Sequence, residues 1–127
     1  MKKILTTLSL VAAAQVGAQT GEDAAEKISY AREILPILSE NCFFCHGPDE
    51  EQQKADLRLD IRENAMKASA WNPENPAESK AIIRIFSSDA EKIMPPPDSH
   101  RTLTADQKDL IKRWVEQGAE YETHWAF

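Results

Sequence analysis

The sequence has little of what most enzymes and membrane proteins require. Among its 127 residues are only two cysteines, three histidines and four glycines. It contains no internal repeat, no glycine-rich phosphate-binding loop and no Ser/His/Asp set of the kind that hydrolases use. Runs that alternate apolar and polar residues, as strands do, are nearly absent. The sequence therefore predicts an all-α protein.

The first residues have the pattern of a secretory signal peptide. Lys2 and Lys3 form a positive start, residues 4–14 are mostly apolar, and residues 16–18 offer the small side chains that a signal peptidase needs. The apolar stretch is too short, and too interrupted by hydroxyl side chains, to span a membrane comfortably. We therefore predict cleavage after Ala18 and an exported, periplasmic protein that does not span the membrane once cleaved.

The chain that remains after the predicted cleavage is acidic. Loss of the two signal-peptide lysines takes the formal net charge from −6 to −8. This acidity argues against a nucleic-acid partner and mildly favours a basic or neutral protein partner, although solubility alone explains it equally well. Residues 19–29 are polar and small, so we predict a flexible leader followed by one domain over residues 30–127.

The most informative stretch is Cys42-Phe43-Phe44-Cys45-His46. Two thiols three positions apart can each reach a different vinyl group of one porphyrin, and the following imidazole can bind the iron. This C-x-x-C-H pattern predicts one covalently attached haem c, with His46 as the proximal ligand. A redox-active thiol pair and half of a zinc site are the alternatives.

Both alternatives need features that the sequence does not offer. A thioredoxin-like protein would place the motif in a βαβ pattern, and none is visible. Zinc would need two further ligands, and the remaining histidines, His100 and His124, have no matching spacing. Attachment of haem uses both sulfurs and leaves no free thiol in an oxidising compartment.

A second stretch, Met94-Pro95-Pro96-Pro97, offers a ligand for the other face of the iron. Successive prolines fix an extended backbone, so the Met94 sulfur is held at little entropic cost. A core methionine beside a rigid loop is the alternative. Met66 lies in a short amphipathic segment, where packing in the core is the better interpretation.

Apolar periodicity and capping residues predict about four short helices. Asp60 with Glu63, and Thr104 with Gln107, have the spacing of capping boxes. Pro76 suits a first helical position. The predicted helices span residues 33–41, 61–68, 76–87 and 105–118.

Residues between these helices give weaker indications. Leu57 and Leu59 alternate with polar residues in an extended segment with one face inward. Arg58 could reach a haem propionate, although a lone arginine is more often solvated. Four apolar side chains are expected to keep the haem dry: Phe43, Phe44, Leu57 and Ile93. The aromatic end, Trp125 to Phe127, needs a surface to dock on or a longer chain.

In combination, these stretches resemble the planctomycete-type cytochrome c domain. The resemblance covers about residues 30–127 and implies a cytochrome c-like helical fold around one haem, attached at Cys42 and Cys45. It also implies axial ligation by His46 and Met94. In that family the domain commonly begins a longer exported protein, so this chain could be a standalone carrier or a fragment. The matching stretches are residues 34–49, 57–60, 94–97, 114–121 and 124–127.

We therefore expect a monohaem c-type cytochrome that is not an enzyme and passes single electrons between transient protein partners. Thioether ligation favours ferrous iron. One alternative is a haem enzyme or gas sensor, which would need Met94 to leave an open iron position. Another is a structural haem module fused to, or docked on, further exported domains.

Overall fold

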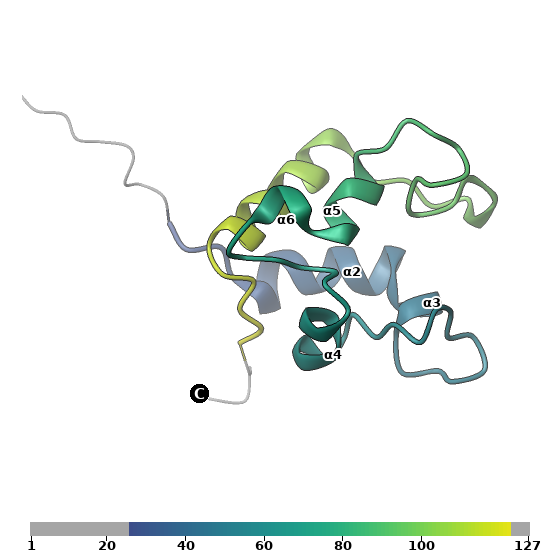
Figure 1. Ribbon diagram of the computed structural model, residues 1–127, viewed down its shortest axis with the longest axis horizontal. Helices are drawn as coiled ribbons and strands as arrows, with labels where there is room; N and C mark the ends of the chain where they lie inside the picture. Colours follow the sequence, from purple (N-terminus) through teal and green to yellow (C-terminus); the bar gives the residue numbers. More distant parts are fainter. Residues whose placement is uncertain (1–25, 123–127) are drawn as a thin grey trace, which may run out of the picture.

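The computed structural model describes residues 26–122. Three predicted features lie outside the described residues: the signal peptide, residues 19–25 of the leader, and the aromatic end with His124. Every regular element between residues 26 and 122 is a helix and none is a strand, which confirms the all-α class (Figure 1). None of these helices is long and apolar enough to cross a membrane. The elements are η1 (Tyr30–Ile34), α2 (Leu35–Asn41), α3 (Phe43–His46), α4 (Arg62–Lys67), η2 (Pro76–Glu78), α5 (Lys80–Ile85), η3 (Pro97–Ser99) and α6 (Ala105–Glu116).

The first helix begins earlier than the sequence predicted. A π-helical turn, η1, starts at Tyr30 and runs directly into α2, and the Ser29 hydroxyl accepts a hydrogen bond from the Arg32 N–H. This cap satisfies one of the free N–H groups at the helix start. Ile28 is buried, so residues 26–29 pack on the domain. The last four residues of the predicted leader, residues 19–29, are therefore part of the domain.

The start of α4 corrects a second expectation. Ile61, in extended conformation, precedes the helix, and no side chain caps its first turn. Asp60 instead accepts two hydrogen bonds from Arg58, at 3.0 and 2.6 Å. A bidentate pair of this kind satisfies both groups, so the carboxylate is not available as a cap.

The predicted helix over residues 76–87 is broken in two. The 3₁₀ turn η2 begins at Pro76, and α5 follows after Ser79, whose backbone is extended. Ser79 is fully buried, and its hydroxyl accepts a 2.7 Å hydrogen bond from the Asn72 N–H. Serine side chains that bond nearby backbone groups compete with helix formation in this way.

The last helix, α6, agrees closely with the prediction. Thr104 and Gln107 form both bonds of a capping box, and Gly118 adopts a φ of +117° just beyond the helix end. Its apolar stripe, including Trp114 and Val115, is buried. The stripe packs on η1, which supplies Ile34, so the first and last helices are in contact.

Aromatic rings fill the space between these helices. Tyr30 and Tyr121 stack with their centroids 4.4 Å apart, and Trp114 lies 5.7 Å from Tyr30 and 5.5 Å from Tyr121. Trp71 meets Trp114 edge-on at 5.3 Å and donates a hydrogen bond from Nε1 to the Tyr121 hydroxyl. Such tilted and edge-on pairs add to the stabilisation from buried area.

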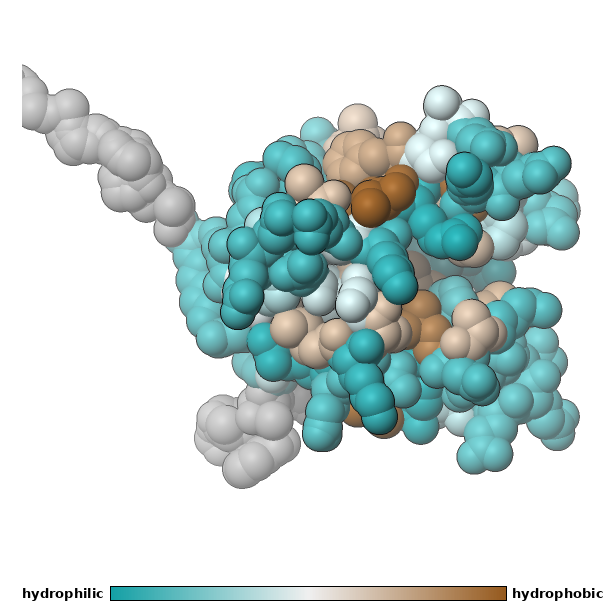
Figure 2. Space-filling model, in the orientation of Figure 1, coloured by the Kyte–Doolittle hydropathy of each residue, from teal (hydrophilic) through white to brown (hydrophobic). Residues whose placement is uncertain are grey.

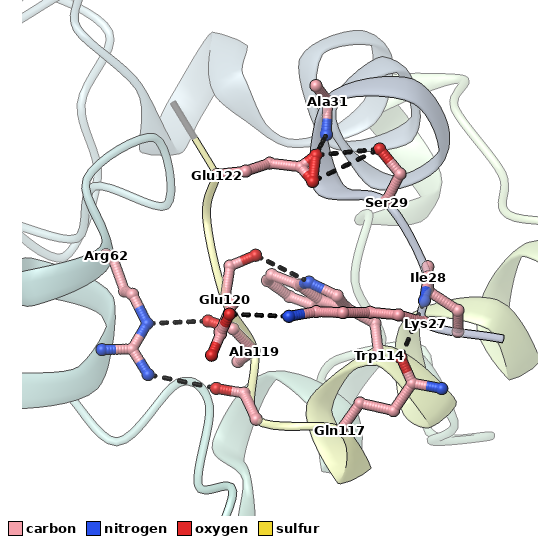
Figure 3. A network of polar contacts seen from close by, with 11 residues as sticks. Lys27, Ile28, Ser29, Ala31, Arg62, Trp114, Gln117, Ala119, Glu120 and Glu122 are labelled. Atoms are coloured by element: carbon pink, nitrogen blue, oxygen red, sulfur yellow. Dashed lines mark hydrogen bonds and ion pairs between the residues drawn. The ribbon is translucent and has the colours of Figure 1, made fainter. Parts of the chain in front are cut away.

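The two ends of the described chain are held together by polar contacts, which we call the terminal network (Figure 3). The Ile28 N–H donates to Gln117, and Glu122 accepts from the Ser29 hydroxyl at 2.9 Å. Arg62 of α4 donates to two carbonyl groups just beyond α6, those of Ala119 at 2.7 Å and Gly118 at 3.0 Å. These two carbonyls follow the helix end and have no partner inside it.

Candidate functional site

The C-x-x-C-H motif forms one short helical turn. The backbone leaves α2 at Cys42, where φ is −125° and ψ is −35°, and immediately begins α3. The N–H groups of Cys45 and His46 both donate to the Cys42 carbonyl, at 3.2 and 2.8 Å. The two thiols are half-buried and not joined in a disulfide. One turn therefore carries both sulfur atoms and the imidazole.

Gly47 ends this turn in a position that no side chain could share. A Cβ placed there would lie 2.3 Å from the Phe43 carbonyl oxygen and 2.9 Å from the Phe43 Cβ. Its backbone is extended, so the restriction comes from this close approach and not from a left-handed conformation. The chain can turn away directly after His46 only because glycine follows it.

His46 lies half-buried beside the segment that returns past it. Its carbonyl oxygen accepts a 2.7 Å hydrogen bond from the Leu59 N–H. The ring atom Nδ1 is buried and has no hydrogen-bond partner among residues 26–122. Burial lowers the pKa of His46, the nearby carbonyls of Lys54 and Leu57 act in the opposite direction, and the Arg84 charge lowers it further. A lowered pKa favours the neutral imidazole, which is the form that binds iron.

Cys42 is a poor candidate for thiol redox chemistry. Burial, together with neighbouring Cys45, raises the pKa of the Cys42 thiol to about 12. Reactive cysteines have lowered pKa values and are attacked as thiolates. For zinc, no three His, Cys, Asp or Glu side chains between residues 26 and 122 converge on a point that could hold a metal ion. The described geometry thus supports neither alternative to haem.

Met94 lies at the end of the loop that follows α5. Its side chain is half-buried against the core, and its N–H donates to the Arg84 carbonyl at 3.2 Å. Pro95 and the following prolines lead from there into η3. Met66, in α4, also packs against the core, as the sequence predicted.

Arg84 shows that Met94 and His46 lie in one region. Its carbonyl holds the Met94 backbone, and its charge is close enough to act on the His46 imidazole. Figure 1 places α3 and the connection from α5 to α6 at the same end of the molecule. Figure 2 shows the surface recessed between them.

Two residues that were considered for the surroundings of the haem lie at the surface or in an ion pair. Phe44, expected to exclude water, is 53% exposed. Arg58, weighed as a propionate contact, is paired with Asp60. Leu57 and Phe43 are partly buried against the core. Arg84 and Arg101, which hold the segment around Met94, were not found from the sequence because no local pattern marks their contacts.

Comparison with known proteins finds one family that matches part of this chain. Residues 42–98 match the family model described as Planctomycete cytochrome C. These residues form part of a planctomycete-type cytochrome c domain. The matched segment of this cytochrome c domain runs from the first cysteine of the motif to beyond Met94. No curated protein and no solved structure matches the chain.

Two surface hollows of the cytochrome c domain lie away from this site. One, of about 470 Å³, is lined by residues of α6 and of the segment around Ile28. Another, of about 400 Å³, lies between Arg62 and Trp71. Neither is lined by Cys42, Cys45, His46 or Met94. We assign the candidate site by its residue types, because neither of these two hollows contains them.

Proposed function

We propose that this protein is a monohaem c-type cytochrome that carries single electrons, with haem attached at Cys42 and Cys45 and the iron held by His46 and Met94. The observation that carries the proposal is the helical turn of the motif. It presents two unpaired thiols and a neutral, half-buried imidazole within a segment that matches the cytochrome c family.

Haem, when bound, supplies a reversible one-electron change between ferrous and ferric iron. The chain would supply the surroundings of that change. His46 provides a neutral nitrogen ligand, fixed at its backbone by Leu59. Met94 provides a thioether, which favours the ferrous state relative to a second nitrogen. With both ligands bound, no iron position is open to oxygen or peroxide, and this supports a carrier over an enzyme.

We further propose that the carrier works outside the cytoplasm and exchanges electrons with other proteins through brief contacts. The predicted signal peptide supports export. Covalent attachment also suits an exported protein, because it uses both thiols where free thiols would be oxidised. The acidic composition favours a neutral or basic protein partner over nucleic acid.

The decisive experiment is a visible spectrum of the protein expressed with haem-maturation machinery. We expect haem that stays attached through denaturation. We also expect a low-spin spectrum in the reduced state and a sulfur–iron charge-transfer band in the oxidised state. Attached but high-spin haem would favour an enzyme or gas sensor with an open position. Absence of attached haem would contradict the proposal and return the cysteines to disulfide or zinc chemistry.

Met94→Ala tests the ligand, and Met66→Ala is its matched control. Both variants shorten a half-buried methionine that packs against the core. Only Met94→Ala is expected to abolish the charge-transfer band, lower the reduction potential and let the ferric iron bind added imidazole. The same changes in both variants would show a general loosening of the fold and would contradict the assignment of Met94.

A further inference from the structure

The segment over residues 94–101, which we call the distal segment, is fastened to the domain at both ends. At its start, the Met94 N–H donates to the carbonyl of Arg84, close to the end of α5. The Arg84 side chain also donates to the Lys92 carbonyl at 3.3 Å, which closes the loop that leads to Met94. This end is thus held mainly through backbone atoms, which side-chain substitutions leave in place.

The other end is held by a side chain. Arg101 Nε donates a 3.0 Å hydrogen bond to the carbonyl of Glu40, in the last turn of α2. Carbonyl groups in a last helical turn have no partner within the helix, and an arginine is well suited to satisfy one. The same guanidinium lies over the Phe44 ring, with 5.3 Å from its central carbon to the ring centroid.

One of these contacts lies just before the haem-attachment motif and the other lies within it. Glu40 lies two residues before Cys42, and Phe44 lies between the two cysteines. Arg101 therefore connects the segment that carries Met94 directly to the turn that carries His46. It also explains why Phe44 is exposed, since the ring supports a cation at the surface and does not face the core.

We propose that Arg101 is a positioning residue that holds the distal segment against the attachment motif and so keeps Met94 on the iron. The inference rests on the proposed function, because it requires Met94 to be the ligand. A thioether binds iron weakly, so its occupancy depends on how firmly the protein holds the segment in place. Release of Met94 would require the distal segment to move away from Glu40 and Phe44.

The test is a titration of the ferric holoprotein with imidazole, which binds only when Met94 leaves. Arg101→Gln is expected to raise the apparent imidazole affinity on the order of tenfold, as expected for loss of a hydrogen bond from a charged donor. Phe44→Leu, which removes the ring and leaves both cysteines, should raise it about two- to fivefold. Arg113→Gln is the matched control, because Arg113 is paired with Asp109 on α6 and has no contact with the distal segment in the interactions described.

A second control separates positioning from general stability. Thr104→Ala removes the cap of α6 and should lower the melting temperature without changing the imidazole affinity. If Arg101→Gln does not fold, the same titration is done with Arg101→Lys. This variant keeps the positive charge but loses the planar donor group, so we expect it to bind imidazole more tightly than the wild type.

The possible outcomes distinguish the two proposals. A wild-type spectrum without the sulfur–iron band would overturn the proposed ligation itself. If the wild type shows that band and the Arg101 variant that folds binds imidazole exactly as the wild type does, only the role of Arg101 is overturned. An equal gain in affinity in the Thr104→Ala variant would likewise overturn it, because general destabilisation would then explain the effect.

Discussion

The hydroxyl group of Tyr121 donates a 2.8 Å hydrogen bond to the carbonyl oxygen of Leu59, although 62 residues separate them. The N–H of the same Leu59 donates to the carbonyl of His46. One residue therefore connects the end of the domain to the peptide group of the proposed proximal ligand. The hydroxyl also accepts from Trp71, so both of its hydrogen-bonding functions are used.

Replacing Tyr121 with Phe is expected to lower the free energy of unfolding by about 1–3 kcal/mol, because two buried polar groups would lose their partner. Urea denaturation of the wild type and the variant measures this difference. Tyr30→Phe is the control, since it removes a hydroxyl from the ring stacked on Tyr121 without touching the Leu59 contact. Equal losses in the two variants would show that the Leu59 contact contributes nothing of its own.

The two tyrosines also predict a loss of stability at alkaline pH. Burial raises the pKa of Tyr30 to about 12 and raises that of Tyr121 as well. An unfolded tyrosine releases its proton near pH 10. Above that pH the folded protein retains protons that the unfolded chain has lost, so the free energy of unfolding falls as pH rises from about 10 through 12.

This prediction can be checked by denaturation at several pH values from about 9 to about 11. The wild type should lose stability steadily, while a variant with both tyrosines changed to Phe should show a shallower slope. A slope that is identical in the two proteins would assign the alkaline effect to other groups, such as the lysines.

Gly47→Ala is expected to disturb the attachment turn. The added methyl group would meet the Phe43 carbonyl oxygen at 2.3 Å, so α3 or the following chain must shift. We expect a loss of about 1–3 kcal/mol in stability and a lower yield of attached haem. Thermal unfolding and the haem content after denaturation measure the two effects.

Gly118→Ala is the informative comparison. A Cβ there meets nothing closer than 3.8 Å, and the cost arises only from its φ of +117°. This variant should lose stability but keep a normal yield of attached haem. A lower haem yield in both variants would show that attachment responds to stability in general and not to the shape of the turn.

The features that the sequence could predict are local. The capping box of Thr104 and Gln107, and the single turn of the C-x-x-C-H motif, depend on residues within four positions of each other. The burial of Trp114 follows from helical periodicity, which is also local. In each case, neighbouring residues are enough to determine the conformation.

Predictions failed where a competing contact was not expected. Asp60 had the spacing of a cap but pairs with Arg58, and Ser79 interrupts a helix because its hydroxyl bonds to Asn72. The contact between Arg101 and Glu40 spans 61 residues and leaves no local pattern. Such contacts exist only once the helices have packed, so periodicity and capping rules cannot reveal them.

The terminal network also bears on the order in which the protein matures. Its contacts between the two ends of the described chain join residues that are 89 to 93 positions apart, as in the bonds from Ile28 to Gln117 and from Ser29 to Glu122. Contacts between such distant residues form late, because closing a long loop costs entropy before it is rewarded. If the chain is exported as proposed, it cannot complete these contacts until Glu122 has left the export channel. The proposed attachment of haem at Cys42 and Cys45 would then take place while this part of the fold is still open.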